Sequence, residues 1–395
     1  MNRSHLTLGL ACLLLLSLQT AAQNLIYSLS TAETRASFQA RFGSNLFQRP
    51  VNERLAMLRR YRKTEIYSLS MIDDKRSLLF SDEGQNFEIW PSLGFGQPLA
   101  TTKAYVKGVE REWRTQPTPG AFSTPESVYE ISLDGSNKFR RLFETKPNLS
   151  TAIVNRAGTK DFFQSEDNGK SIIYIYDVAT GNLLHTWDLN AVLKTNCPGC
   201  LSESEGWLAL ENRLFFNVDI VGDDGEEDSV SAPPHGGPGT YTVAEDGTDI
   251  GEIPPETGQS QMPGYVRVAS ARPTLIGELP DGTYAFLDYA MKRGPLLKAP
   301  AQAQTFLVLA KPGVQGRKVI PLRPARLEFF HISPSGKYLA FTEARMTKDY
   351  RTETHLWVKD LESGEEKELL TLPPPNPPTS PQPNETLVVL GWTEK

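Results

Sequence analysis

Short apolar runs separated by tight turns fill the C-terminal part of the chain. The runs are residues 329–332, 338–342, 355–358 and 368–370, and the turns between them include residues 333–337 and 360–364. Runs of this length that are bounded by Gly, Pro, Ser and Asp are typical of β-strands. Four antiparallel strands joined by tight turns within about 45 residues match one blade of a β-propeller.

The same order of strands and turns recurs upstream, between residues 155 and 187. When the two units are aligned, Gly158 falls on Gly336, and the turn at 177–181 falls on the turn at 360–364. Further strands beside an Asp-Gly turn occur at residues 128–136, 241–248 and 279–286. A unit that recurs in this way predicts an all-β chain built from blades.

Two of these segments carry a family resemblance. Ser-Pro-Ser-Gly-Lys-Tyr-Leu-Ala-Phe at 333–341 and Val-Tyr-Glu-Ile-Ser-Leu-Asp-Gly-Ser at 128–136 resemble the TolB-like, WD40-like (PD40-type) propeller repeat. Degenerate versions of the repeat extend over residues 65 to 395. The resemblance implies a closed propeller of about six four-stranded blades, with five to seven as the range, that binds proteins or small ligands at its channel mouth, usually without catalysis.

Closure of the ring is expected to involve both ends of the chain. Isolated blades cannot bury both of their faces, so a propeller has to close. Residues 387–392 form one strand of an unfinished blade behind the Pro-rich linker 373–383, and we expect them to pair with an N-terminal strand such as 24–29. The linker itself is typical of a polyproline spacer, with an SH3-type ligand as the alternative. These patterns predict a single propeller domain over residues 23–395.

A helical insertion is predicted at about residues 49–62. Val51, Leu55 and Leu58 share one helical face, whereas Arg54 and Arg59 point elsewhere. We expect this short helix to pack on the outside of the propeller or across one channel end. Docking on an anionic membrane or a partner is the alternative.

The first 22 residues have the pattern of a secretion signal. Arg3 precedes an apolar run from Leu6 to Leu18, and small residues lead up to Ala22. The run is shorter than the roughly 20 residues that span a bilayer, so we expect cleavage after Ala22 and no transmembrane anchor. A lipoprotein reading of Cys12 is disfavoured because Gly9 stands where a lipobox prefers Leu. Export to the periplasm or the medium is the prediction.

Cys197 and Cys200 are the two cysteines that remain after this cleavage. They flank a Pro-Gly pair, which places the ends of a tight turn within disulfide reach, and an exported compartment is oxidising. We therefore predict a local structural disulfide. A haem site would need His at position 201, which is Leu201. A zinc site would need two further ligands, and a thioredoxin-like redox pair would need a helix after the cysteines.

Charge excludes one class of partner. The chain carries 41 basic and 47 acidic residues, a net charge of −6, which lacks the electrostatic footprint of a nucleic-acid binder. We therefore expect no nucleic-acid partner, and we expect a monomer.

Two glycine-containing motifs mimic catalytic loops without their partners. The segment 235–239, His-Gly-Gly-Pro-Gly, matches the oxyanion-hole turn of some α/β-hydrolases, but the chain has no Gly-x-Ser-x-Gly nucleophile elbow. The segment 168–171 ends like a phosphate-binding loop, but Gln164 replaces the leading glycine and a strand follows. Neither motif predicts a catalytic or cofactor-binding residue.

An acidic run at residues 223–228 leaves one cation possible. Oxygen-rich loops can hold calcium, but Ile220 and Gly222 occupy the first ligand positions of an EF-hand loop, so that motif is excluded. Such runs are usually solvated. We assign no metal ligand and no cofactor, with calcium at this run as the alternative.

These patterns predict an exported, non-catalytic β-propeller that binds a protein, peptide or cell-envelope ligand through its loop face. The alternative is a propeller enzyme, a hydrolase or lyase acting on sugars or lactones with channel carboxylates. A surface adhesin or sensor module is a third hypothesis.

Overall fold

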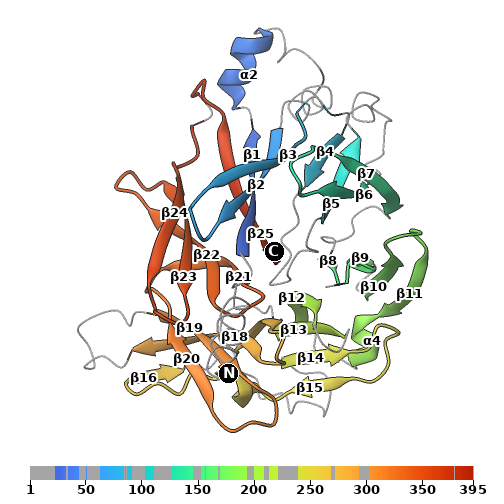
Figure 1. The fold of residues 1–395 in the computed structure, drawn as a ribbon, viewed down its shortest axis with the longest axis vertical. Helices are drawn as coiled ribbons and strands as arrows, with labels where there is room; N and C mark the ends of the chain where they lie inside the picture. Colours follow the sequence, from blue (N-terminus) through green and yellow to red (C-terminus); the bar gives the residue numbers. More distant parts are fainter. Residues whose placement is uncertain are drawn as a thin grey trace, which may run out of the picture.

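A six-bladed β-propeller is seen in the computed structural model (Figure 1). The structure describes residues 23–32, 34–43, 50, 63–83, 85, 87–90, 103–110, 126–145, 153–155, 157–167, 170–193, 200–208, 213–220, 239–267, 272–292, 303–377 and 379–394. These residues form six antiparallel sheets, five with four strands and one with five. The predicted all-β propeller of about six blades is confirmed.

The blades follow one another along the chain. Blade 1 contains β25 (Asn384–Glu394), β1 (Gln23–Ala32), β2 (Lys63–Ser70) and β3 (Arg76–Ser81). Blade 2 contains β4 (Phe87–Trp90), β5 (Lys103–Glu110), β6 (Glu126–Ser132) and β7 (Phe139–Thr145). Blade 3 contains β8 (Ile153–Val154), β9 (Lys160–Asp167), β10 (Lys170–Asp177) and β11 (Leu183–Asp188).

The second half of the ring repeats this order. Blade 4 contains β12 (Cys200–Trp207), β13 (Leu214–Ile220), β14 (Gly239–Val243) and β15 (Gly251–Ile253). Blade 5 contains β16 (Tyr265–Arg267), β17 (Thr274–Glu278), β18 (Tyr284–Lys292), β19 (Ala303–Ala310) and β20 (Arg317–Pro321). Blade 6 contains β21 (Arg326–Ile332), β22 (Tyr338–Met346), β23 (Thr352–Asp360) and β24 (Glu366–Leu372).

The ring closes by pairing the two ends of the chain, as predicted. β1 lies between β25 and β2, and its antiparallel register with β25 runs from Gln23 opposite Glu394 to Ala32 opposite Asn384. Nearly all of the strand is buried, polar residues such as Ser28 and Ser30 included, because the two faces of blade 1 pack into different hydrophobic clusters. The C-terminal strand therefore completes a blade that N-terminal strands begin.

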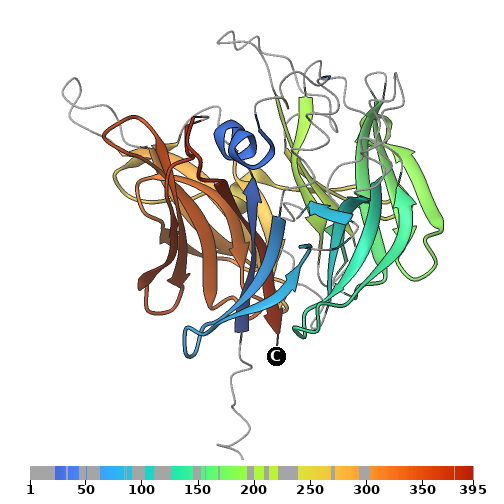
Figure 2. The ribbon, with the colours of Figure 1, turned by 90° about the horizontal axis from the view of Figure 1, so that it is seen from above.

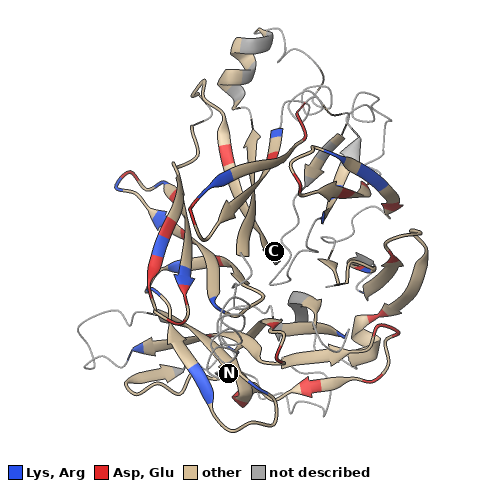
Figure 3. Cartoon of the chain, viewed as in Figure 1, with Lys and Arg blue, Asp and Glu red and all other residues tan. Residues whose placement is uncertain are grey.

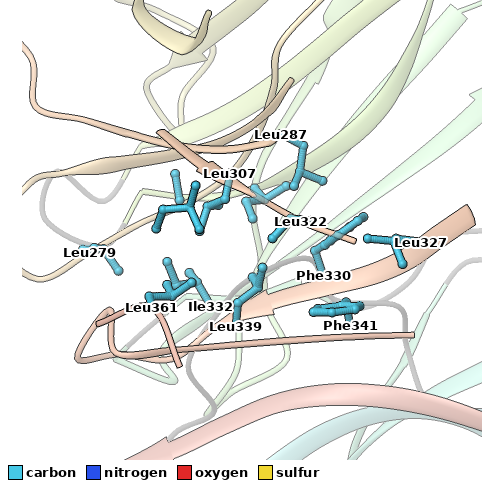
Figure 4. Packing of buried hydrophobic residues seen from close by; sticks show 13 residues of the cluster. Leu279, Leu287, Leu307, Leu322, Leu327, Phe330, Ile332, Leu339, Phe341 and Leu361 are labelled. Carbon is cyan, nitrogen blue, oxygen red and sulfur yellow. The ribbon is translucent and has the colours of Figure 1, made fainter. Parts of the chain in front are cut away.

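Apolar side chains fill the seams between blades. The seam between blades 5 and 6 brings Leu287 and Leu307 of blade 5 against Phe330, Leu339 and Phe341 of blade 6 (Figure 4). Burying a side chain of this size stabilises a fold by about 1.5–3 kcal/mol. The strands are rich in apolar residues on both faces for this reason.

The repeated turns have the geometry that the sequence alignment predicts. Gly158 donates its amide to the carbonyl of Asn155, and Gly336 donates in the same way to Ser333, at 2.9 and 2.8 Å. Both glycines adopt a positive φ, near 70°, which L-residues disfavour. The aligned glycines are thus required by the same turn in two blades.

The described residues contain one short helix near the N-terminus, α2 (Arg35–Phe42), which lies upstream of the predicted insertion at about residues 49–62. Thr34 caps it by accepting a hydrogen bond from the Ser37 amide at 3.1 Å, and the Thr34 hydroxyl donates to the carbonyl of Ser380 in the linker. Residues 51–62 of the predicted insertion lie outside the described residues. The other described helices are α4 (Leu189–Leu193) and the 3₁₀ turn η3 (Pro255–Gly258). Among the described residues, none of these helices has the length and apolarity to cross a bilayer.

Candidate functional site

The two ends of the propeller carry different connections. At one end of the ring, connections join the second strand of each blade to the third, and the last strand of each blade to the first strand of the next. We call this end the loop face. Its longer connections are residues 33–62, 111–125, 221–238, 293–302 and 373–383. The opposite end, the turn face, is joined mainly by tight turns such as 178–182, 333–337 and 361–365, with residues 91–102 as a longer connection. Figure 2 shows α2 at the loop face and the C-terminus at the turn face.

Most of the segments that the sequence singled out attach to the loop face. The acidic run 223–228 and the 235–239 motif both belong to the connection from β13 to β14, and only Gly239, the first residue of β14, lies within the described residues. The linker is fixed at its ends, because the Asn376 side-chain amide donates to the Pro383 carbonyl at 2.8 Å. Because residues 223–228 lie outside the described residues, the calcium alternative stays a prediction.

The predicted disulfide is likewise untested. Cys200 is the first residue of β12, and Cys197 lies outside the described residues. The signal segment 1–22 lies outside them as well.

Many residues on the strands of blade 6 are charged (Figure 3). Several of them meet Arg323 from the connection to blade 5. Arg323, in the connection between the two blades, binds Glu343 of β22 at 2.6 Å and Glu366 of β24 at 3.0 Å. Its guanidinium lies 3.5 Å from the centroid of the Trp357 ring, a cation–π contact. One arginine thus spans three strands of its neighbouring blade.

Each of these carboxylates binds a second cation. Arg345 lies 3.1 Å from Glu343, and Lys359 lies 2.9 Å from Glu366. Because Glu343 is buried, its charge needs such partners to offset the cost of desolvation. The network is therefore satisfied within the protein.

His355 lies close to this network on β23. Its Nδ1 is 2.9 Å from Glu368 and 3.1 Å from the Thr371 hydroxyl, and its Nε2 is 3.3 Å from Glu353. Hydrogen bonds from Thr371 and then His355 lower the pKa of Glu368. Nδ1 therefore links β23 to β24, whereas Nε2 lies near Glu353 of its own strand and makes no hydrogen bond of normal geometry with a described residue.

A second polar group lies in the seam between blades 2 and 3. Lys107 of β5 and Glu126 of β6 form a buried ion pair at 2.7 Å. Asp161 of β9 is fully buried, and neither of its carboxyl oxygens makes a hydrogen bond of normal geometry. Burial raises the pKa of Asp161 to about 8, against the opposing effects of the Phe162 and Ile153 amides and the Lys107 charge. Asp161 is therefore mainly protonated at neutral pH.

These arrangements decide what the described residues can do chemically. Glycoside hydrolysis needs a protonated and an ionised carboxyl flanking a substrate. Asp161 is protonated but has no exposed surface, and Glu353 and Glu368 are bound to His355. Within the described part of the chain, no group of three His, Cys, Asp or Glu side chains is arranged to hold a metal ion. These three carboxyls therefore do not form such a pair, and the alternative of an enzyme with channel carboxylates stays a prediction.

The blade 6 network was not predicted from the sequence. A signal was present, because Glu343 and Arg345 alternate along β22, and Glu353, His355 and Lys359 alternate along β23. Charges with period two in a strand otherwise rich in apolar residues mark one face as polar. Arg323 lies outside these strands, and its part could not be inferred from alternation.

Comparisons with known proteins concern the fold. No protein-family model matches the sequence, and no curated protein matches it. Among solved structures, TolB from Acinetobacter baumannii is similar, with 13% identity, a TM-score of 0.47, and coverage of 93% of this chain and 67% of that chain. A putative TolB from Agrobacterium tumefaciens has 12% identity, a TM-score of 0.40, and covers 92% and 98%. An acylaminoacyl peptidase from Pyrococcus horikoshii has 9% identity, a TM-score of 0.38, and covers 87% and 44%. TolB proteins are thus among the similar propellers, and so is a peptidase.

Proposed function

We propose that this chain is an exported, non-catalytic β-propeller that binds a protein, peptide or cell-envelope ligand through its loop face, as a monomer. One observation carries the proposal: the strand ends that the longer connections join lie at one end of the ring, whereas mainly short turns join the strand ends at the other. Rigid scaffolds that display variable loops on one side commonly use those loops for recognition. The closed β1–β25 pairing supplies such a scaffold.

The chemistry of the described residues supports binding over catalysis. The ion pairs of blade 6 and of the seam between blades 2 and 3 are occupied within the protein. A negative net charge and an N-terminal segment with the pattern of a secretion signal support an exported, soluble protein.

Masking each face in turn tests the proposal. The mature chain would be immobilised and used to capture partners from an envelope extract. Single cysteines coupled to polyethylene glycol would then cover one face at a time, with Glu83→Cys, Val266→Cys or Lys348→Cys on the loop face and Ile72→Cys, Ser136→Cys or Val314→Cys on the turn face. We expect loop-face masking to abolish capture and turn-face masking to leave it intact. The proposal fails if no partner is recovered, or if only turn-face masking blocks recovery.

Two further measurements address the alternatives. Turnover of any member of a panel of sugars or lactones by the same protein would establish the alternative, a hydrolase or lyase. Heating the protein with and without calcium tests the acidic run at 223–228. We expect an unchanged Tm, because the proposed binding needs no cation.

A further inference from the structure

A hairpin on the loop face presents two apolar side chains to solvent. It joins β22 to β23, and we define the blade 6 hairpin as residues 345–351. Tyr350 is 86% exposed and Met346 is 67% exposed. Among the described large apolar side chains, only Ile72 of the turn face, at 73%, is comparably exposed. Large apolar side chains in such positions contribute little to folding.

The hairpin holds Tyr350 on a fixed backbone. The Thr347 amide donates to the Arg351 carbonyl at 2.7 Å, and the Tyr350 amide donates to the Thr347 carbonyl at 3.1 Å. The Arg351 guanidinium binds Asp349 at 2.7 Å. A partner that bound this tip would therefore have little loop to order, and preorganisation of this kind favours affinity.

The conformation of Tyr350 is costly for the fold. Its φ is 61°, in the left-handed region that glycine occupies at Gly313 and Gly364. The other described non-glycine residues in this region are Asp74, Asn137, Asp249 and Phe329. A residue with a Cβ is disfavoured there. Within the described residues, the Tyr350 side chain makes no hydrogen bond, ion pair or ring contact that would offset this strain. Folding therefore does not explain the tyrosine.

The charges of the hairpin indicate the kind of partner. Arg345, Lys348 and Arg351 are basic, whereas Asp349 is its one acidic residue, on a chain whose net charge is −6. Arg345 binds Glu343 and Arg351 binds Asp349, which leaves Lys348 as the exposed cation that makes no ion pair with a described residue. Exposed tyrosine beside arginine is the composition that interface hot spots favour. Electrostatic complementarity then calls for carboxylates on the partner.

We propose that the blade 6 hairpin is the anchor point for an acidic protein segment whose apolar residues pack on Tyr350 and Met346. This inference rests on the proposed loop-face function and names its partner class. A membrane is a poorer fit, because two apolar side chains provide little area for insertion.

Selection from a phage-displayed library of random linear peptides on the mature chain provides the probe. We expect the selected peptides to combine Asp or Glu with apolar residues. Tyr350→Ala and Met346→Ala should each raise the Kd of these peptides by about 10-fold or more, the effect of removing a hot-spot residue. Tyr350→Phe should bind these peptides with the Kd of the parent. Lys348→Glu should also raise their Kd, and the increase should be larger at low salt, where charges are less screened.

Ile72→Ala is the matched control, because it removes an equally exposed apolar side chain from the turn face. We expect its Kd and the Tm of every variant to match those of the parent. The inference fails if the selected peptides are not acidic, or if Tyr350→Ala leaves their Kd unchanged. It also fails if the protein instead binds phosphatidylglycerol vesicles in a Tyr350-dependent way.

The outcomes separate this inference from the function on which it rests. Peptides that bind the loop face but ignore Tyr350→Ala would overturn the inference and leave the proposed function standing. Peptides that lose affinity only with Ile72→Ala would overturn both.

Discussion

The side chain of Asn217 in blade 4 pairs with the backbone of Leu275 in blade 5 as a neighbouring strand would. Its Nδ2 donates to the Leu275 carbonyl at 2.9 Å, and its Oδ1 accepts from the Leu275 amide at 2.9 Å. The Thr240 hydroxyl donates to the same oxygen at 2.9 Å. One buried amide therefore links two blades of the ring.

Replacing this amide should destabilise the propeller. Asn217→Leu leaves the buried amide and carbonyl of Leu275 without partners, and each unsatisfied group costs about 1–3 kcal/mol. We expect the free energy of unfolding to fall by about 2–4 kcal/mol, measured by urea denaturation. Asn182→Ala, at an exposed turn, is the control and should change it little. Equal effects of the two changes would show that the link is unimportant.

Trp392 makes the corresponding link at the closing blade. Its indole nitrogen donates to the His331 carbonyl at 2.9 Å in a fully buried site. Trp392→Phe keeps an aromatic ring but removes this buried hydrogen bond, so we expect a loss of about 1–3 kcal/mol and faster amide exchange in β1. Trp187→Phe breaks a similar bond to the Glu245 carbonyl in a half-buried site and should cost less. A larger effect at Trp187 would contradict this ranking.

The pKa of Asp161 makes the stability of the fold depend on pH. Burial raises this pKa from 3.8 to about 8, so between these values the folded protein holds a proton that the unfolded chain has released. Stability from this group is therefore lost as the pH rises from about 4 to about 8. We expect Asp161→Asn to remove that loss, so its advantage over the parent should grow with pH by at most ~1.4 kcal/mol per unit.

Urea unfolding of both proteins at several pH values between 4 and 9 measures this difference. Asp177→Asn is the control of opposite sign, because hydrogen bonds from Thr180 lower the pKa of Asp177. Asp177 adds stability that is lost as the pH falls, so the deficit of its variant should shrink in acid. A difference between parent and Asp161→Asn that does not vary with pH would contradict the buried-acid interpretation.

Strain at Tyr350 predicts that glycine is more stable than alanine at this position, the reverse of the usual order. Tyr350→Gly and Tyr350→Ala both remove the ring, but only glycine tolerates a φ of 61°. We expect the glycine variant to be more stable than the alanine variant by about 1 kcal/mol, from thermal or urea unfolding. The same pair at Ile72, which has no positive φ, should show the opposite order. If the glycine variant were less stable than the alanine variant at Tyr350 as well as at Ile72, Tyr350 would not be strained.

The sequence predicted the fold well where local patterns repeat. The alignment of Gly158 with Gly336 indicated the same turn in two blades, because a tight turn depends on local sequence alone. The strand at 387–392 has no partner strands beside it in the sequence, and this indicated closure by pairing with the N-terminal strand. Helix α2 was missed because Arg35–Phe42 has little apolar periodicity, although Thr34 is a typical N-cap.

Prediction of the site from the sequence was limited. Arg323 and Trp357 are brought together only by the packing of two blades, and no spacing along the chain reveals that contact. The burial of Asp161 similarly depends on residues of the neighbouring blade. The polar groups of a propeller are thus set by which blades meet, and repeat patterns carry no information about that.

The pairing of β1 with β25 also orders events in time. Residues 23–32 are made early, yet their partner, residues 384–394, is the last described strand to be synthesised. Contacts between such distant residues form slowly, because the chain must first lose the entropy of the long intervening loop. Until β25 is available, β1 of blade 1 therefore keeps one unpaired strand edge, and the ring can close only after the last described strand has been made.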